Sequence, residues 1–314
     1  MGKIAYLFPG QGSQKVGMAK DFFDADVAVQ ERMQRLDNCL DVPLSAMMFE
    51  GPEEALRQTQ NTQPAILIHS ILAYNALMAA GAPKPDIVAG HSLGEYSALV
   101  ASGALELEAA ATAVQLRGRL MQSAVPVGVG AMAAVLGLAP ETIDKICGDL
   151  SAKEGAYVSV ANYNGGGQTV VAGNAETVEM ALPIFKESGA KRALPLPVSA
   201  PFHCQLMEPV QSPLKEHLSS LDWSDPSVPW VANVDAKLHE SKEDILDLLN
   251  DQVTAPVRFT QMVKTLLEQG VDTFVEIGPG KVLTGILKRE AKGCHFLNVS
   301  QESDLAAVAN ALNA

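Results

Sequence analysis

The fold is decided by the stretch DIVAGHSLGEYSALVA, residues 86–101. Its first residues, Asp86–Ala89, are typical of a short strand, and its last residues are typical of a helix. Between them, Gly90-His91-Ser92-Leu93-Gly94 has the GxSxG spacing of a nucleophile elbow, a sharp strand-to-helix turn that exposes a reactive serine. The glycines leave Ser92 uncrowded, and the first N–H groups of the helix, including that of Leu93, could stabilise an oxyanion. The alternative interpretation is an ordinary glycine-rich turn.

Strands and helices alternate on both sides of this motif. The segments expected before residue 128 are a strand at Ile4–Phe8 and helices at Lys15–Asp24, Pro64–Gly81 and Leu107–Met121. The segments expected after residue 198 are strands at Val228–Asn233, Val271–Ile277 and Cys294–Val299 and helices at Ser241–Leu249, Phe259–Glu268 and Val282–Arg289. Because such alternation produces right-handed crossovers, we expect a mostly parallel sheet in a large α/β-hydrolase-like domain.

The region between these two halves follows a different order. After a linker at Pro126–Gly130, strands and helices are expected at Ala131–Leu138, Pro140–Leu150, Tyr157–Ala161, Thr169–Ala172, Glu176–Ser188 and Arg192–Pro197, with a turn at Asn162–Gly167. The order βαββαβ is that of a ferredoxin-like fold. We therefore expect a discontinuous large domain (residues 1–127 and 199–314) and a small inserted ferredoxin-like subdomain (128–198). A cleft between them is the natural ligand site.

Composition and charge restrict the partners of this chain. Its 314 residues can bury a large core without metal or disulfide support. Asp and Glu outnumber Lys and Arg by 36 to 23, a net charge of −13, so nucleic acid and anionic membrane are unfavourable partners. The four cysteines form no CxxC pair, and no cluster has metal-ligand spacing, so we expect neither disulfides nor a metal site. The N-terminus is typical of a strand rather than a signal peptide, and we expect a cytoplasmic protein.

A serine nucleophile needs a base, and six histidines are available. His203 is the candidate, because it follows Val198 where the chain re-enters the large domain and can face the cleft. His69 lies in an apolar helix, and His91 is expected to point away from Ser92. The other three lie in polar or C-terminal segments: His217, His239 and His295.

Arg117 is unusual because it continues the apolar face of an expected helix. It lies three and four residues after Val114 and Ala113 on the helix Leu107–Met121. A guanidinium on a buried face needs an anionic partner. That partner is either a protein carboxylate in a structural ion pair or a substrate carboxylate held by two parallel hydrogen bonds.

Two glycine-rich loops are not nucleotide sites. In the loop after the first strand, a GxGxxG pattern would need glycine where Lys15 stands. A P-loop ending at Lys281 would need glycine at Val275 and serine or threonine at Val282. We therefore expect no cofactor.

Six segments together are similar to a known family. In chain order they are FPGQGSQ (8–14), GHSLGEYSAL (90–99), QLRGRLMQ (115–122), VANYN (160–164), the segment around His203, and IGPGKVL (277–283). They closely resemble the malonyl-CoA:acyl carrier protein transacylases, the malonyl loading enzymes of type II fatty acid synthesis. Stand-alone acyltransferases of polyketide pathways share these motifs, so the pathway stays open.

The resemblance implies a role for each matching catalytic position. Ser92 is the expected nucleophile that carries the malonyl ester, and His203 is its general base and acid. The backbone N–H groups of Gln11 and Leu93 are the expected oxyanion hole. The backbone carbonyl of Gln252 is expected to orient the histidine, so that no acidic third member is needed.

The resemblance also implies residues that bind the substrate. Arg117 is expected to bind the malonyl carboxylate. Asn162, Met121 and Phe202 are expected to line the acyl pocket, where the Phe202 ring would crowd an α-methyl group. Four basic residues either serve solubility or contact coenzyme A phosphates and an acidic carrier protein: Lys191, Arg192, Lys288 and Arg289.

The expected function is therefore transfer of malonyl from malonyl-CoA to holo acyl carrier protein by a ping-pong cycle, carried out by a monomer. The alternatives are an acyltransferase of a polyketide pathway and a serine thioesterase or other hydrolase. A hydrolase would need an acidic residue between nucleophile and histidine in chain order and would leave Arg117 without a role. A non-catalytic scaffold that only docks the carrier protein is a further alternative.

Overall fold

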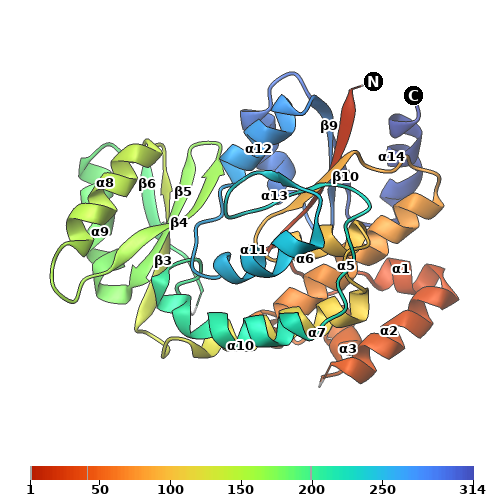
Figure 1. The fold of residues 1–314 in the computed structure, drawn as a ribbon, viewed down its shortest axis with the longest axis horizontal. Helices are drawn as coiled ribbons and strands as arrows, with labels where there is room; N and C mark the ends of the chain where they lie inside the picture. The colour runs from red at the N-terminus through yellow and green to blue at the C-terminus, as the bar shows by residue number, and fades with distance from the viewer. Residues whose placement is uncertain (1, 41, 199) are drawn as a thin grey trace.

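The computed structural model describes residues 2–40, 42–198 and 200–314. Met1 and Ser199, at which expected domain boundaries fall, therefore lie outside the described residues. The described chain forms two separate sheets, each with its own helices (Figure 1). Within these ranges, no helix is both long enough and apolar enough to cross a membrane.

The larger sheet has six strands in the order β10-β9-β1-β2-β7-β8. Their bounds are β1 Lys3–Phe8, β2 Ile87–Gly90, β7 Trp230–Val231, β8 Leu238–His239, β9 Val271–Ile277 and β10 His295–Val299. Five strands are parallel, and only β8 at the edge runs antiparallel to its neighbour β7. The carboxyl ends of the parallel strands therefore meet at one edge, where open α/β sheets bind their ligands.

Helices cover both faces of this sheet. Their bounds are α1 Lys20–Ala25, α2 Val27–Cys39, α3 Leu44–Glu50, α4 Glu53–Leu56, α5 Thr59–Ala79, α6 Gly94–Ala101, α7 Leu107–Ser123, α10 Glu208–Ser219, α11 Ile245–Asp251, α12 Phe259–Glu268, α13 Val282–Glu290 and α14 Leu305–Leu312. Along β1, Tyr6 and Phe8 belong to the core shared with α5 and α7, whereas Ala5 and Leu7 pack with α12 and α13. This alternation follows from the period of two along a strand.

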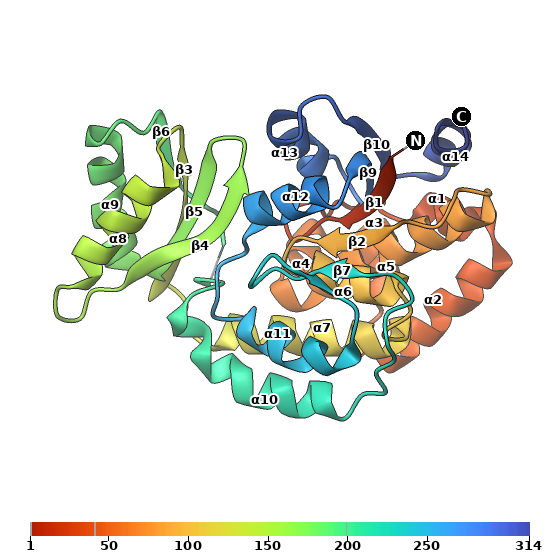
Figure 2. The same cartoon turned by 45° about the horizontal axis from the view of Figure 1, so that its top comes forward.

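The smaller sheet confirms the expected βαββαβ order. Its elements are β3 Gly130–Leu136, α8 Pro140–Ser151, β4 Val158–Gly165, β5 Gln168–Asn174, α9 Ala175–Glu187 and β6 Arg192–Pro195. The strands pair antiparallel in the order β4-β5-β3-β6, and α8 and α9 share a core of their own with the sheet. Figure 2 shows this subdomain beside the larger sheet.

Several expected elements differ from the structure in their type or bounds. The turn expected at Asn162–Gly167 is instead mostly strand, since β4 continues to Gly165 and Asn162 forms a bridge with Val257. The helix expected at Pro64 begins at Thr59, where side chains of the first turn bond back to α4. The helix expected from Lys15 begins only at Lys20. The sequence analysis missed helices α2, α3, α4, α10 and α14.

Candidate active site

The GxSxG motif forms a strained turn between β2 and α6. Ser92 has a φ of 52°, in the left-handed region that residues with a side chain rarely adopt. A Cβ on Gly90 would lie 2.0 Å from the backbone of Gly94, and a Cβ on Gly94 would lie 2.0 Å from the carbonyl oxygen of Phe8. The side chain of Asn233 holds the turn, because it accepts from Ser92 N at 2.7 Å and donates to Gly90 O at 2.7 Å. Contacts distant in sequence therefore maintain the strain at Ser92.

Replacing Gly90 with alanine is expected to lower the free energy of unfolding by about 3 kcal/mol or more, because the added methyl group meets backbone rather than a movable side chain. Gly148→Ala is the matched control. Gly148 is an exposed position in α8 where an added Cβ meets no atom within 4 Å, so alanine there should stabilise the helix by about 0.5–1 kcal/mol. Urea unfolding measures both, and equal stabilities for the two variants would contradict the strained turn.

Ser92 and His203 form a hydrogen-bonded pair. Ser92 Oγ lies 2.7 Å from His203 Nε2, and His203 Nδ1 lies 2.8 Å from the carbonyl oxygen of Gln252. Because a carbonyl only accepts, Nδ1 carries the ring proton, and Nε2 can take the proton of the hydroxyl. Burial, followed by the positive charge of Arg117, lowers the pKa of His203 to about 3, so the ring is neutral at neutral pH. The geometry is that of a nucleophile with its base.

The N–H groups of Leu93 and Gln11 are available to a ligand. Leu93 directly precedes α6, so its N–H is one of the unpaired donors of a helix N-terminus. Gln11 lines the same cavity as Ser92. Within residues 2–40, 42–198 and 200–314, neither N–H has a hydrogen-bond acceptor. Two free donors beside a serine are the requirement for an oxyanion hole.

Arg117 is fully buried in α7, as its position on the apolar face predicts. Its guanidinium donates to Gln63 Oε1 at 2.7 Å, to Gln252 Oε1 at 2.8 Å and to Ser92 Oγ at 3.2 Å. The described part of the chain supplies no carboxylate within ion-pair distance of this group. The structural ion pair weighed from the sequence is therefore not formed, and the cation is open to an anion from outside.

A cavity of about 450 Å³ joins these residues at the junction of the two subdomains. Its lining includes Ser92, His203 and Arg117 together with all the residues expected in the acyl pocket, which are Met121, Asn162 and Phe202. Gln252 is completely buried behind this cavity. The structure thus brings together segments that are far apart in the sequence.

Sequence reasoning missed three residues of this site. Gln63 lies in the polar first part of helix α5 and contacts Arg117. Glu95 is a buried carboxylate in α6, and Asn233 follows β7. A charged side chain in a mostly apolar helix was the available signal for Glu95, whereas Gln63 follows other polar residues and had no such signal. Nothing local distinguished Asn233, because its role depends on the distant turn that it holds.

His91 points away from Ser92, as expected. Its Nε2 lies 2.8 Å from Asn164 Oδ1 in the small subdomain. His69 is buried in α5 and stacks edge-on against Phe22. Among the residues that the structure describes, no group of three His, Cys, Asp or Glu side chains could hold a metal ion.

One residue of each basic pair, Lys191 and Arg289, lies beside the same glycine turn. Lys191 packs against Gly137, whose N–H donates to Gly167 O at 2.7 Å. Arg289 Nη1 donates to the neighbouring Gly166 O at 3.2 Å. We name this exposed set the basic rim; its members are Lys191, Arg192, Lys288 and Arg289.

Comparison with known proteins gives consistent results. The acyl transferase domain family matches residues 5–310. The malonyl CoA-acyl carrier protein transacylase of Bacillus subtilis (strain 168) is 45% identical over 300 residues, which are 96% of this chain and 94% of that protein. The structure of the Coxiella burnetii malonyl CoA-acyl carrier protein transacylase is 40% identical, with a TM-score of 0.95 over 99% of this chain and 98% of that one. A malonyl-transacylase solved in complex with its type II PKS acyl-carrier protein is 42% identical, with a TM-score of 0.94 over 98% and 99% of the chains.

Proposed function

The chain belongs to the acyl transferase domain family, and on this premise we propose that it transfers the malonyl group of malonyl-CoA to the phosphopantetheine thiol of acyl carrier protein. The observation that carries the proposal is the position of Ser92 Oγ, 2.7 Å from His203 Nε2 and 3.2 Å from Arg117 Nη2. One hydroxyl thus contacts both a base and a cation. The test is intact mass after incubation with malonyl-CoA: a malonyl adduct should form and then disappear when holo carrier protein is added. An adduct that never passes to the carrier would contradict the proposal.

In the first half of the cycle, the Ser92 hydroxyl attacks the thioester carbonyl. His203 Nε2 takes the hydroxyl proton as the new O–C bond forms. The N–H groups of Leu93 and Gln11 stabilise the oxyanion of the tetrahedral intermediate. When that intermediate collapses, the C–S bond breaks, and the proton on His203 passes to the coenzyme A thiolate. The product is a malonyl ester on Ser92.

In the second half, the carrier thiol gives its proton to His203 and attacks the ester. The C–O bond breaks, and the proton returns to Ser92 Oγ, so that the enzyme is regenerated. The same base and the same N–H donors serve both halves. Because His203 is buried and Ser92 is only partly exposed, water has limited access to the ester, which favours transfer over hydrolysis.

Arg117 selects the malonyl group. Its guanidinium is buried and contacts only neutral partners among the described residues, so a substrate carboxylate supplies the missing negative charge. Acetyl-CoA cannot supply that charge. Met121 and Phe202 line the remaining space, and the Phe202 ring, on the segment of the histidine, limits substituents on the α-carbon.

The basic rim is proposed to bind the phosphates of coenzyme A or acidic groups of the carrier protein, because it concentrates four cations on a chain of net charge −13. Lys288→Glu combined with Arg289→Glu should raise KM for carrier protein several-fold, with little change in kcat. Steady-state kinetics at low salt measures this effect.

The matched control for the basic rim is Lys3→Glu combined with Lys84→Glu. Both lysines are exposed and lie where β1 and β2 begin, at the sheet edge opposite the catalytic turn. This control changes the net charge equally and should leave KM unchanged. An equal KM for both double variants would show that the rim does not dock the carrier.

A type II PKS carrier protein is a second candidate substrate. One solved relative, 42% identical over nearly the whole chain, is the malonyl-transacylase of such a carrier. The chemistry at Ser92 is the same for both carriers, so assays with a fatty acid and a polyketide carrier protein decide between them. The hydrolase alternative is disfavoured because it has no use for Arg117, and accumulation of free malonate would support it.

We propose that one chain is the working unit, since every residue assigned to the cleft between the large domain and the small subdomain (128–198) comes from the same protomer. Static light scattering tests this proposal. We also propose a reducing compartment such as the cytoplasm, which suits four cysteines that form no CxxC pair.

A further inference from the structure

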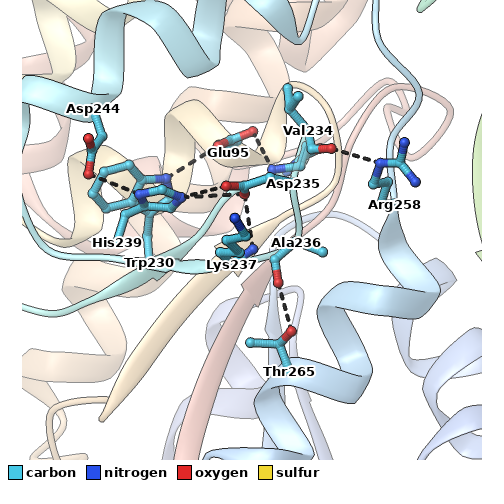
Figure 3. A network of polar contacts seen from close by, with 11 residues as sticks. Glu95, Trp230, Val234, Asp235, Ala236, Lys237, His239, Asp244, Arg258 and Thr265 are labelled. Atoms are coloured by element: carbon cyan, nitrogen blue, oxygen red, sulfur yellow. Dashed lines mark hydrogen bonds and ion pairs between the residues drawn. The ribbon is translucent and has the colours of Figure 1, made fainter.

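A buried carboxylate lies directly behind the catalytic residues. Glu95, in the first turn of α6, is almost completely inaccessible to solvent. Its Oε1 accepts from Trp230 Nε1 at 3.3 Å, and its Oε2 accepts from Asn233 N at 3.2 Å and from Gln252 Nε2 at 2.7 Å. Figure 3 shows Glu95 directed toward Trp230 and the backbone beside Val234. No step of the transfer cycle uses this carboxylate.

The partners of Glu95 are the residues that hold the catalytic groups. Gln252 contacts all three of Ser92, His203 and Arg117. Its backbone carbonyl oxygen accepts from His203, and its side-chain Oε1 accepts from Arg117. Its Nε2 donates to the carbonyl oxygen of Ser92 at 3.0 Å. Asn233 holds the backbone of Ser92. Glu95 therefore contacts both residues on which the nucleophile, the base and the cation depend.

Glu95, Arg117 and the carbonyl group of Ser92 together fix which way the Gln252 amide points. An ionised carboxylate only accepts, so it must face the NH₂ group of the amide. The amide oxygen is then left for Arg117, which only donates. A neutral side chain at position 95 would accept less strongly from the NH₂ group of the amide, so the amide would hold the guanidinium and the Ser92 backbone less firmly. Glu95 and Arg117 thus bind opposite ends of one amide, without direct contact between their charges.

On this basis, and assuming the proposed malonyl transfer, we propose that Glu95 is a positioning residue. Its ionised carboxylate fixes the amide of Gln252 and, through it, the guanidinium of Arg117 and the imidazole of His203. Glu95 touches no reacting atom, and its effect should be greatest on the step that needs the malonyl carboxylate.

Because Glu95 is buried, its role can be tested by the pH dependence of malonylation. Desolvation raises the pKa of Glu95 to about 7, despite the hydrogen bonds from Gln252, Asn233 and Trp230. As the pH falls through 7, Glu95 becomes protonated, and malonylation should slow. The other charged or titratable groups around it are Arg117, Tyr96, His203, Asp235 and, behind Trp230, His239. The pKa of His203 is lowered to about 3, so this histidine does not titrate in the same range.

The test compares Glu95→Gln with Glu276→Gln. Glu276 is an equally buried carboxylate that accepts from Leu283 N and Thr284 N at the start of α13. The rate of Ser92 malonylation is measured from pH 5.5 to 8.5, together with the melting temperature. Glu95→Gln should malonylate about 10- to 100-fold more slowly at pH 8 and should lack the acid limb near pH 7. Glu276→Gln should lose stability but retain the wild-type pH profile.

A second variant keeps the proposal testable even if Glu95→Gln does not fold. Trp230→Phe deletes one donor to Glu95 without touching Gln252, so it should move the acid limb to higher pH. Wild-type rates and an unchanged limb in Glu95→Gln or Trp230→Phe would overturn the positioning role. A loss of rate with the limb retained would also overturn it, because that outcome indicates a merely structural carboxylate. If the wild type itself is not malonylated, the proposed function fails instead.

Discussion

Replacing Ser92 with alanine is expected to abolish malonylation of the protein and to reduce malonyl transfer by at least about 10⁴-fold. The reason is that the cycle has no other route: without Oγ, no ester forms, and the carrier thiol has nothing to attack. The variant should still fold, because the removed hydroxyl contacts only His203 and Arg117 through side chains. Intact mass after brief incubation with malonyl-CoA measures the adduct, and a coupled assay measures the transfer.

Ser97→Ala is the matched control for this variant. Ser97 lies on α6, the helix that follows Ser92, where it is fully buried, and its hydroxyl has no partner among the described residues. It should acquire the adduct at the wild-type rate. A malonyl adduct that persists on Ser92→Ala would assign the ester to another residue. Free malonate without an adduct on the wild type would indicate a hydrolase.

Replacing Arg117 with alanine is expected to invert the choice between malonyl-CoA and acetyl-CoA. Transfer of malonyl should fall by about 10²- to 10³-fold, because its carboxylate would enter a buried pocket without a charged partner. Transfer of acetyl should fall far less or rise, because in the wild type it leaves the guanidinium buried and unpaired. The ratio of kcat/KM for the two thioesters measures this inversion directly.

Arg119→Ala is the control for the removal of an arginine from α7. Arg119 lies two residues further along the helix, where it donates to Gln115 Oε1 at 3.3 Å, and it does not line the cavity. It should leave the ratio of the two thioesters unchanged. If Arg117→Ala lowered both activities equally, the arginine would serve the structure of the site rather than the selection of substrate.

Local patterns were sufficient to predict most of the elements. The strand before Ser92, the helix after it and the βαββαβ order of the small subdomain all follow from short apolar runs separated by glycine and proline. The helix Phe259–Glu268 and the strand Val271–Ile277 have the bounds that were predicted. One predicted element was wrong where tertiary contacts determine the structure. The turn expected at residues 162–167 is largely strand β4, because Asn162 pairs with Val257.

The catalytic positions were predicted unequally. Ser92 has a local signature, because the glycines at positions 90 and 94 allow the close backbone contacts of its tight turn. His203 and Gln252 had weak local signals, and their expected roles came mainly from the resemblance to a family. Asn233 was missed because nothing in the neighbouring sequence marks it as functional. Its role depends on its hydrogen bond to Ser92, which is distant in the sequence.

The sequence by itself determined that this chain has a glycine-flanked serine at a strand-to-helix turn, an arginine on an apolar helix face and an inserted subdomain. The serine and the arginine depend on residue type and on spacing over a few neighbouring residues. The subdomain depends on the order of strands and helices along the chain. Only the tertiary structure decided that Ser92, His203 and Arg117 meet, and that Gln252 and Glu95 hold them. The physical reason is that these contacts join segments separated by up to 160 residues. Their distances depend on how the helices and loops pack around the larger sheet, which no local pattern encodes.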